Sequence, residues 1–324
     1  MYDNIISIEN LCNAWSEFVK GKKSKRDVSE FSLNLSRNIY ELHTELKTQT
    51  YTHNNYQHFK INDPKPRDIH KAMVKDRLLH HANYRILYPY FDNKFIYDSY
   101  SCRLRKGTHK AILKISKLTR KVSKNNTKQC YILKCDIKKF FASIDQYILM
   151  EILKNYIEDQ NTIKLIEKVT KSFHSTELHK GLPLGNLTSQ LLVNIYMNEF
   201  DNFIKHILKV KYYIRYADDF IILSKNKDLL MTMLPKFNYF LKTNLKLLLN
   251  PNKIHIKTIY SGIDYLGWVH FPHYRVLRTS TKKRIFRNLK LKEGKMETIQ
   301  SYLGLLRHGD AYKLENKIKK EILC

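Results

Sequence analysis

The sequence predicts an α+β fold in which a short β-hairpin and a separate strand carry acidic residues. The run Tyr212–Leu223 has aromatic and β-branched residues on both sides of Asp218 and Asp219, as in a hairpin. A second apolar run, Tyr131–Leu133, leads into Asp136. Many other stretches place apolar residues at helical spacing. We therefore expect strands beside the acids and helices around them.

Helical spacing dominates the first fifty residues, where Phe31, Leu35 and Ile39 recur every fourth residue. A basic loop with two prolines, Asn62–Ile69, comes next. The segment Asp76–Leu87 then returns to a helical period. This part of the chain is predicted to be helical, interrupted by one loop.

The middle of the chain alternates helices with the predicted strands. Glu151–Lys171 reads as one or two amphipathic helices, and the turn-rich loop Gly181–Gln190 leads into an apolar helix, Leu191–Phe203. After the hairpin, Asp228–Leu245 is again helical. The last third is expected to hold short strands followed by a basic helical tail. The predicted strands are Leu245–Leu249, His255–Ile259, Tyr265–Val269 and Arg275–Leu277.

The charge of the chain points to a polyanionic partner. Among 324 residues, 58 Lys and Arg stand against 30 Asp and Glu, giving a formal net charge of +28 and a pI near 9.7. Nucleic acid is the favoured partner and an anionic membrane the alternative. We find no apolar run long enough to span a bilayer and no signal peptide at the N-terminus, so we expect a cytoplasmic protein without a membrane partner. The five cysteines include no C-x-x-C pair, which argues against a zinc site.

The three acids suggest a metal site. Asp218 and Asp219 at a hairpin tip would repel each other unless a cation offset the repulsion. An exposed turn is the plain alternative, because Asp is common in turns. Asp136, at the end of another strand, favours the metal site over the exposed turn. Three carboxylates on one sheet can hold two Mg²⁺ ions about 4 Å apart, as in enzymes of phosphoryl transfer. Polymerases and nucleases both use such a pair.

Three motifs in this order resemble the palm of a reverse transcriptase. They are Lys134–Asp145, Gly181–Gln190 and Tyr216–Asp219, with further similar blocks at Phe95–His109 and Tyr265–Trp268. The resemblance implies a right-hand polymerase with fingers, palm and thumb, an antiparallel palm sheet carrying the carboxylates, and a helical thumb. It implies an N-terminal helical extension (1–60), fingers (61–130), a palm (131–275, with a finger insertion at about 150–180) and a thumb (276–324).

The implied activity is RNA-directed DNA synthesis from dNTPs, with two Mg²⁺ ions, or Mn²⁺ as a substitute, on template RNA and RNA/DNA hybrid. Intron and retron enzymes usually carry Gln-Gly and Ser-Pro where this chain has Leu184-Gly185 and Ser189-Gln190. That departure resembles reverse transcriptases of diversity-generating retroelements. It implies error-prone cDNA with errors at adenines and an accessory variability protein oligomer. A reverse transcriptase of another bacterial lineage, such as a phage-defence enzyme, or an inactive RNA-binding scaffold, are the alternatives.

The resemblance also implies roles for single residues. Asp136, Asp218 and Asp219 would be the metal triad, with Asp218 the closer ligand of the adjacent pair. Ile137 would lend its backbone carbonyl, and Phe141 would be the gate that rejects a ribose 2′-hydroxyl; Phe140 reads as plain core.

Further positions are implied to contact nucleotide or nucleic acid. Leu184 would loosen the nascent base pair, Gln190 would contact template or nucleotide, and Lys253 would protonate or screen the departing pyrophosphate. Lys65, Arg67 and Arg77 would bind the triphosphate, although an exposed loop with solvated charges explains them as well. A basic thumb helix would grip the duplex through Lys282, Lys283, Arg284 and Arg287; a solvated helix face is the alternative.

Overall fold

The computed structural model describes residues 1–62, 66–291 and 295–323. The chain forms two compact units. The first comprises Met1–Tyr97, Ile137–Lys209 and Asn238–Leu249, and the second Asp98–Asp136, Val210–Phe237 and Asn250–Cys324. Each unit is therefore assembled from three separate stretches of the chain. The predicted division into extension, fingers, palm and thumb stays a prediction.

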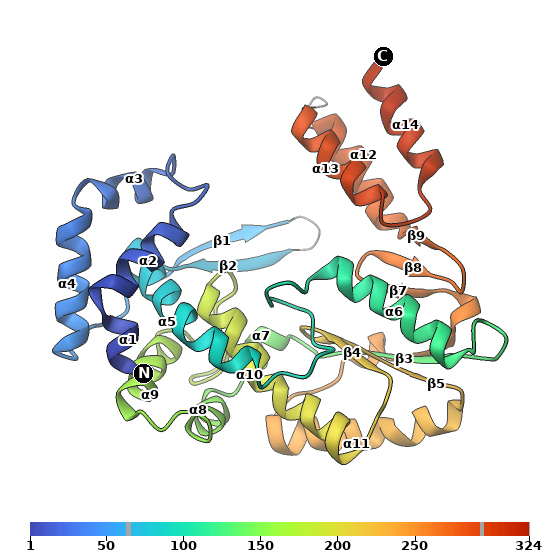
Figure 1. Ribbon diagram of the computed structural model, residues 1–324, viewed down its shortest axis with the longest axis horizontal. Coiled ribbons are helices and arrows are strands. Elements are labelled where there is room, and N and C mark those ends of the chain that lie inside the picture. The colour runs from blue at the N-terminus through green and yellow to red at the C-terminus, as the bar shows by residue number, and fades with distance from the viewer. Residues whose placement is uncertain (63–65, 292–294, 324) are drawn as a thin grey trace. The chain divides into compact units, whose positions relative to one another are not determined.

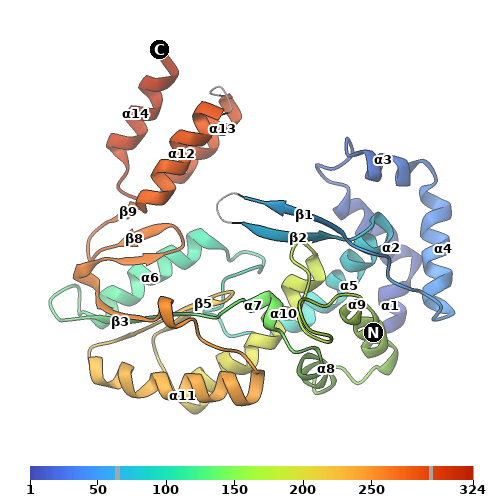
Figure 2. The same cartoon turned by 180° about the vertical axis from the view of Figure 1, so that it is seen from behind.

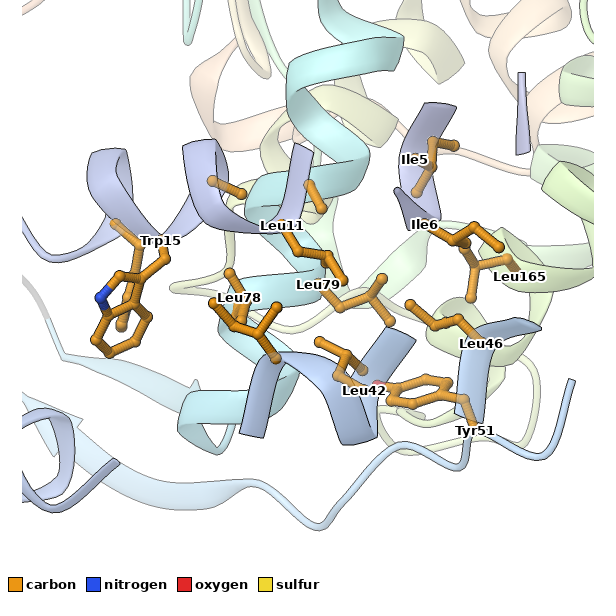
Figure 3. Close-up of a cluster of buried hydrophobic side chains, with 14 of the residues drawn as sticks. Ile5, Ile6, Leu11, Trp15, Leu42, Leu46, Tyr51, Leu78, Leu79 and Leu165 are labelled. Atoms are coloured by element: carbon orange, nitrogen blue, oxygen red, sulfur yellow. The ribbon is translucent and has the colours of Figure 1, made fainter. Parts of the chain in front are cut away.

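The first unit begins with a helical cluster that confirms the predicted N-terminal helices. Leu11, Trp15, Leu42 and Leu78 are among its buried side chains, and they come from three helices (Figure 3). Burial of these apolar side chains is the main source of stability in this part of the unit. The helices are α1 (Tyr2–Ile6), α2 (Ile8–Phe18), α3 (Arg26–Leu33), α4 (Leu35–Lys47) and α5 (Val74–Asp92).

An antiparallel hairpin follows the N-terminal helices. Strands β1 (Gln57–Ile61) and β2 (Arg67–Lys71) pair with Ile61 opposite Arg67. Strand β2 thus begins within the region Asn62–Ile69 that the sequence predicted as a loop. The predicted helix Asp76–Leu87 lies within the longer α5.

The rest of the first unit is helical, as predicted. Asp145 caps α8, because its carboxylate accepts a hydrogen bond from the backbone N–H of Ile148 at 3.0 Å. Lys246 pairs with the same carboxylate at 2.7 Å, and together these contacts hold the pKa of Asp145 below its ordinary value despite the opposing effect of burial. The helices are α7 (Phe140–Ser143), α8 (Gln146–Lys154), α9 (Gln160–Lys171) and α10 (Leu187–Asn202).

The second unit is built on a four-stranded antiparallel sheet of order β4-β5-β3-β6. Its strands are β3 (Tyr131–Asp136), β4 (Tyr213–Tyr216), β5 (Asp219–Ser224) and β6 (His255–Thr258). The predicted hairpin and the predicted strand before Asp136 therefore pair in one sheet. Strand β5 lies beside both β4 and β3.

Helix α6 (Thr108–Val122) covers one face of this sheet (Figure 1). Its buried residues Ala111, Ile115 and Leu118 pack with Ile132 and Ile221 of the strands. Helix α11 (Lys227–Leu245) runs on the other side, where the rings of Phe237 and Phe220 meet edge to face at 6.1 Å (Figure 2). Strands β3, β4 and β5 are buried along most of their length, which explains the apolar runs in their sequences, whereas β6 is a partly exposed strand at the edge of the sheet.

The C-terminal part of the second unit has its own core. A three-stranded antiparallel sheet, β7 (Ile263–Tyr265), β8 (Trp268–His270) and β9 (Arg275–Leu277), precedes three helices. Trp268 packs there with Ile285, Leu289 and Ile112 of α6. The helices are α12 (Thr279–Leu291), α13 (Met296–Leu306) and α14 (Tyr312–Leu323).

Three predicted elements differ from the structure. The segment predicted as a strand at Leu245–Leu249 is not one: Leu249 forms only an isolated bridge to Ile137. The predicted strand Tyr265–Val269 is split by a turn, because Leu266 and Gly267 adopt φ of 52° and 86°. Helix α10 begins at Leu187, so Gln190 lies on a helix and not in the preceding loop. The bridge between Leu249 and Ile137 is a tertiary pairing that the local pattern does not contain, whereas the turn at Gly267 and the start of α10 are local features that the apolar pattern alone did not show.

Candidate active site

The three predicted metal ligands lie at one end of the four-stranded sheet. Asp136, the last residue of β3, is directly opposite Asp219, the first residue of β5, in the antiparallel register. Residues paired in this way have Cβ atoms about 5 Å apart. Asp218 stands in the two-residue turn between β4 and β5. The structure therefore brings the three acids into one neighbourhood and pairs Asp136 with Asp219.

The turn that carries Asp218 is strained and braced. Ala217 has φ of 54°, a left-handed conformation that costs energy for a residue with a Cβ. The buried guanidinium of Arg215 donates to the carbonyl of Ala217 at 3.1 Å and to the hydroxyl of Ser99 at 3.3 Å. These contacts fix the backbone next to Asp218. The sequence analysis did not single out Arg215; a charged residue inside an apolar strand was the available signal.

Lysines accompany two of the three carboxylates. Lys253 donates from Nζ to both oxygens of Asp136, at 2.8 Å each. Its position is set by the loop it stands on, because the N–H of Asn250 donates to the carbonyl of Asp136 at 2.8 Å. The Lys253 side chain is 43% exposed, so its ammonium group can leave the carboxylate without unfolding the loop.

Lys134 is the lysine beside Asp219, with Nζ 3.3 Å from Oδ2. It is more confined than Lys253: it also donates to the carbonyl of Asp264 at 2.6 Å and lies over the ring of Tyr265. The sequence analysis missed this residue. Its position two residues before Asp136 on the same strand, and therefore on the same face, was the signal that could have found it.

The acidity of Asp219 is strongly perturbed. Its pKa is raised to about 7, mainly by burial; Lys134 opposes this rise, and the charges of Asp218 and Asp136 add to it. Its Oδ1 atom is buried and has no hydrogen-bond partner among the described residues. A buried carboxylate oxygen without a donor is costly when ionised, so a cation at this position would be stabilising. Still, within the described part of the chain no three His, Cys, Asp or Glu side chains form a ready-made metal cluster.

Two predicted site residues follow Asp136 in the first unit. Ile137 is buried and bridges to Leu249. Phe141, in α7, is partly exposed, whereas its neighbour Phe140 is buried, as expected for a core residue; the two rings meet edge to face at 5.7 Å. Phe141 is thus the ring of the pair that remains accessible.

The loop before α10 is tied to strand β2. The N–H of His70 donates to the carbonyl of Leu184 at 3.1 Å, and the side-chain amide of Asn186 donates to the carbonyl of His70 at 2.9 Å. Gly185 has φ of 106° and lies close to Ile69, so a side chain would be strained there. Leu184 is partly exposed beside this glycine, and Gln190 is partly exposed on the first turns of α10.

The basic residues predicted to bind the triphosphate have different surroundings. Lys65 lies outside the described residues. Arg67 is exposed at the start of β2. The guanidinium of Arg77 lies 2.5 Å from Asp27 and stacks over Phe18, which is a structural arrangement within the first unit. Arg67 is therefore the more available of the two described arginines.

The four basic residues predicted for the thumb all lie on α12. Lys283 and Arg287 are exposed, and Lys282 and Arg284 are partly exposed, while Ile285 supplies the buried face. The helix therefore presents positive charge along its outer side.

A family model described as reverse transcriptase (RNA-dependent DNA polymerase) matches residues 60–270, well over half of the chain. The chain belongs to this family. The predicted membership of the reverse transcriptase family is thereby confirmed, and the match contains all three acids, Lys134 and Lys253. As a member of the reverse transcriptase family, the chain places its acidic residues at the end of an antiparallel sheet, as predicted.

Its relatives include intron-encoded proteins. It is 25% identical over 232 residues to YkfC of Escherichia coli, covering 60% of each chain. It is 22% identical to the putative COX1/OXI3 intron 2 protein of Saccharomyces cerevisiae, covering 77% of this chain and 35% of that protein. It is 28% identical to the group II intron-encoded protein LtrA of Lactococcus lactis, covering 47% of this chain and 25% of LtrA. The alignments thus span less than two thirds of each relative.

Solved telomerases share the fold. Apo telomerase from Candida tropicalis superposes with a TM-score of 0.56 at 12% identity, covering 78% of this chain and 56% of the telomerase. Telomerase from Candida albicans, in complex with a fragment of telomeric RNA, gives 0.54 at 13% identity, covering 86% and 56%. At this identity the likeness establishes the fold alone. Separately, no helix in the described part of the chain is long and apolar enough to cross a membrane.

Proposed function

We propose that this reverse transcriptase family member is an RNA-directed DNA polymerase whose catalytic carboxylates are Asp136, Asp218 and Asp219. The observation that carries the proposal is the register of β3 and β5, which sets Asp136 opposite Asp219 with Asp218 in the adjoining turn. Carboxylates gathered at one sheet end suit the binding of hard divalent cations.

The residues fit two Mg²⁺ ions by their chemistry. All three side chains are oxygen donors, and Oδ1 of Asp219 is buried without a hydrogen-bond donor. Ile137 is proposed to add its carbonyl oxygen. Bound Mg²⁺, or Mn²⁺ in its place, would stabilise the attacking and leaving oxygens of nucleotidyl transfer.

The lysines have distinct proposed roles. Lys253 balances the charge of Asp136 before substrate binds and is exposed enough to turn toward the departing pyrophosphate, to which it would donate a proton. Lys134, held by the carbonyl of Asp264, stays beside Asp219 and limits the repulsion among the acids.

We assign the incoming dNTP to residues of the first unit on the strength of the family motifs. Arg67 and Lys65 would contact the triphosphate, with Arg77 a weaker candidate because Asp27 already engages it. Phe141 would exclude the ribose 2′-hydroxyl. Leu184 and Gln190 would contact the nascent base pair or the template.

The RNA template and the RNA/DNA hybrid are proposed to contact α12. Lys282, Lys283, Arg284 and Arg287 would bind phosphates, which makes the contact independent of sequence. Binding through such contacts weakens steeply as salt increases.

For lineage, we propose the reverse transcriptase of a diversity-generating retroelement, which makes cDNA with errors opposite adenines and works with an oligomeric accessory variability protein. Support for this narrower role comes from Leu184-Gly185 and Ser189-Gln190. The second candidate is a reverse transcriptase of another bacterial lineage, such as a phage-defence enzyme; the intron-encoded relatives favour a different lineage without indicating that particular role.

Primer extension on an RNA template tests the activity. Asp136→Asn and Asp218→Asn should each abolish dNTP incorporation while RNA binding persists. Asp228→Asn, which alters an exposed acid on α11, should retain activity. Undiminished extension by Asp218→Asn would refute the metal assignment, and a wild-type protein without any dNTP incorporation would favour the inactive RNA-binding scaffold.

Sequencing of the cDNA tests the lineage. Copies of a defined RNA should carry substitutions concentrated opposite adenine, and Leu184→Gln should reduce them. Errors spread evenly over the four template bases would instead support the other bacterial lineage.

A further inference from the structure

The segment around α6 has an unusual charge. Between Asp98 and Asp136 the sequence contains no Asp or Glu, yet it contains 11 Lys and Arg. A stretch this long without acids cannot neutralise its cations locally. The basic residues are Arg103, Arg105, Lys106, Lys110, Lys114, Lys117, Arg120, Lys121, Lys124, Lys128 and Lys134.

Helix α6 sorts these charges to its outer side. Its buried face packs on the sheet through Ala111, Ile115 and Leu118. Lys110, Lys117 and Lys121 are exposed, fall within about 40° of one another around the helix axis and point away from that face. They cover about 16 Å along the helix, at 1.5 Å per residue. In Figure 1, α6 runs across the front of the second unit with this length uncovered by other labelled elements of that unit.

These lysines lack the partners that lysines on other helices have. Lys154 pairs with Glu151, Lys171 with Glu167 and Lys319 with Glu315, each within one helical turn. Among the described residues, by contrast, Lys110, Lys117 and Lys121 form no ion pair. The positive charges of these three lysines are thus not neutralised by neighbouring acids, unlike those of lysines on a typical solvent-exposed helix face.

The loop after α6 extends the positive charge and is held by hydrogen bonds to other parts of the second unit. Lys124, Asn125 and Asn126 all have positive φ, and Asn126 donates to the carbonyl of Pro272 at 3.3 Å and accepts from the hydroxyl of Tyr260 at 2.8 Å. Lys124 and Lys128 are both exposed on it. A fixed loop presents its cations without the entropic cost of ordering a flexible one.

Helix stability does not account for this pattern. Basic residues near a helix C-terminus interact favourably with the helix dipole, which explains Arg120 and Lys121. The effect is confined to the last turn, so it leaves Lys110 and Lys117 unexplained. A membrane-surface helix is also a poor match, because it would need a large apolar face toward the lipid. Leu113 is the only large apolar side chain of α6 that is exposed.

We propose that the outer face of α6, with Lys124 and Lys128, binds the phosphate backbone of a double-stranded stem in the template RNA. This surface is separate from α12 and from the carboxylates. RNA is the occupant because double-stranded RNA is recognised mainly by its shape and phosphates, which matches the row of exposed lysines along α6. The inference rests on the proposed function only in taking the RNA to be a template.

The test is binding of an RNA stem-loop, measured by fluorescence anisotropy across a salt series without nucleotides or divalent cations. The variant carries Lys110→Gln, Lys117→Gln and Lys121→Gln. Its affinity at 0.1 M salt should fall at least about tenfold, and the slope of log K against log salt should shrink by about 2. A matched control, Lys225→Gln, Lys227→Gln and Lys236→Gln, removes the same charge from exposed positions on and before α11 and should bind like wild type.

Two further measurements keep the outcome interpretable. Melting temperatures should be unchanged in both variants, and extension of a short unstructured template should be equal for both, because the carboxylates are intact. Equal losses of RNA affinity in variant and control would overturn the proposal, as would wild-type affinity in the variant. Loss of binding to anionic phospholipid vesicles with RNA affinity retained would assign the face to a membrane instead. Because binding is measured without synthesis, a failure of the polymerase proposal is distinguishable from a failure of this one.

Discussion

Lys253 donates from its ammonium group to both carboxylate oxygens of Asp136, at 2.8 Å each. The pair joins the loop after α11 to the end of β3, and the N–H of Asn250 reinforces it by donating to the carbonyl of Asp136. The charge of Asp136 is neutralised by Lys253, but because the lysine side chain is exposed, it can move away and leave the carboxylate accessible to a cation. The relationship therefore suggests that Lys253 changes partner during the reaction.

Lys253→Gln should lower the rate of nucleotide incorporation by roughly 100-fold, since a positioned proton donor typically contributes that much or more. Affinity for the RNA should be unchanged when measured without divalent cations. Single-turnover primer extension measures the rate. Lys257→Gln, on the exposed side of β6, is the matched control and should be close to wild type; a similar loss in both variants would contradict a specific role for Lys253.

Asp219 should make the metal-free protein less stable as pH rises. Its pKa is raised to about 7, above the ordinary value of 3.8, mainly by burial. The folded state therefore binds more protons than the unfolded state between about pH 4 and 7, and stability falls across that window. Thermal unfolding in chelator should show Asp219→Asn melting higher than wild type at pH 8 and much closer to it at pH 5.

Addition of Mg²⁺ at pH 8 should raise the melting temperature of wild type more than that of Asp219→Asn, because a cation stabilises the ionised carboxylate. The exposed-acid variant Asp228→Asn should follow wild type at both pH values. A pH-independent difference between Asp219→Asn and wild type would argue against the raised pKa.

Phe141→Val should increase incorporation of ribonucleotides relative to deoxyribonucleotides, because a smaller side chain leaves room for the 2′-hydroxyl. The ratio of kcat/KM for rATP and dATP measures this, and a tenfold change corresponds to about 1.4 kcal/mol of discrimination. Phe140→Val should instead lower stability without altering the ratio, since that ring is buried. Unchanged discrimination in Phe141→Val would remove the assignment of the sugar gate.

Gly309→Ala should destabilise the C-terminal helices by about 1–3 kcal/mol, the usual cost of overpacking. A Cβ at Gly309 would overlap the indole ring of Trp268, which is 1% exposed in the core of that region. Gly304→Ala is the control: it stands on α13 with open space around it and should stabilise slightly. Chemical denaturation compares the two, and equal stabilities would contradict the packing of Trp268.

Several features could be read from local sequence. The hairpin of β4 and β5 and the strand that ends at Asp136 were predictable because β-branched and aromatic residues dominate them. The cap of α8 by Asp145 was predictable because the cap residue and its helix are adjacent in the chain. The core position of Phe140 was also predicted, but only the family resemblance distinguished it from Phe141, because two neighbouring rings look alike until a core surrounds one of them.

The sequence by itself determined the family, the positive charge and the three acids, since motifs and composition are properties of the chain alone. Only the tertiary structure decided that Asp219, not Asp218, is the residue opposite Asp136. It likewise decided that Lys134 and Lys253 partner these acids, and that Lys110, Lys117 and Lys121 of α6 form no ion pair with any residue that the structure describes. Pairing depends on strand register and on which distant loop closes over a strand end, and neither is encoded in local spacing.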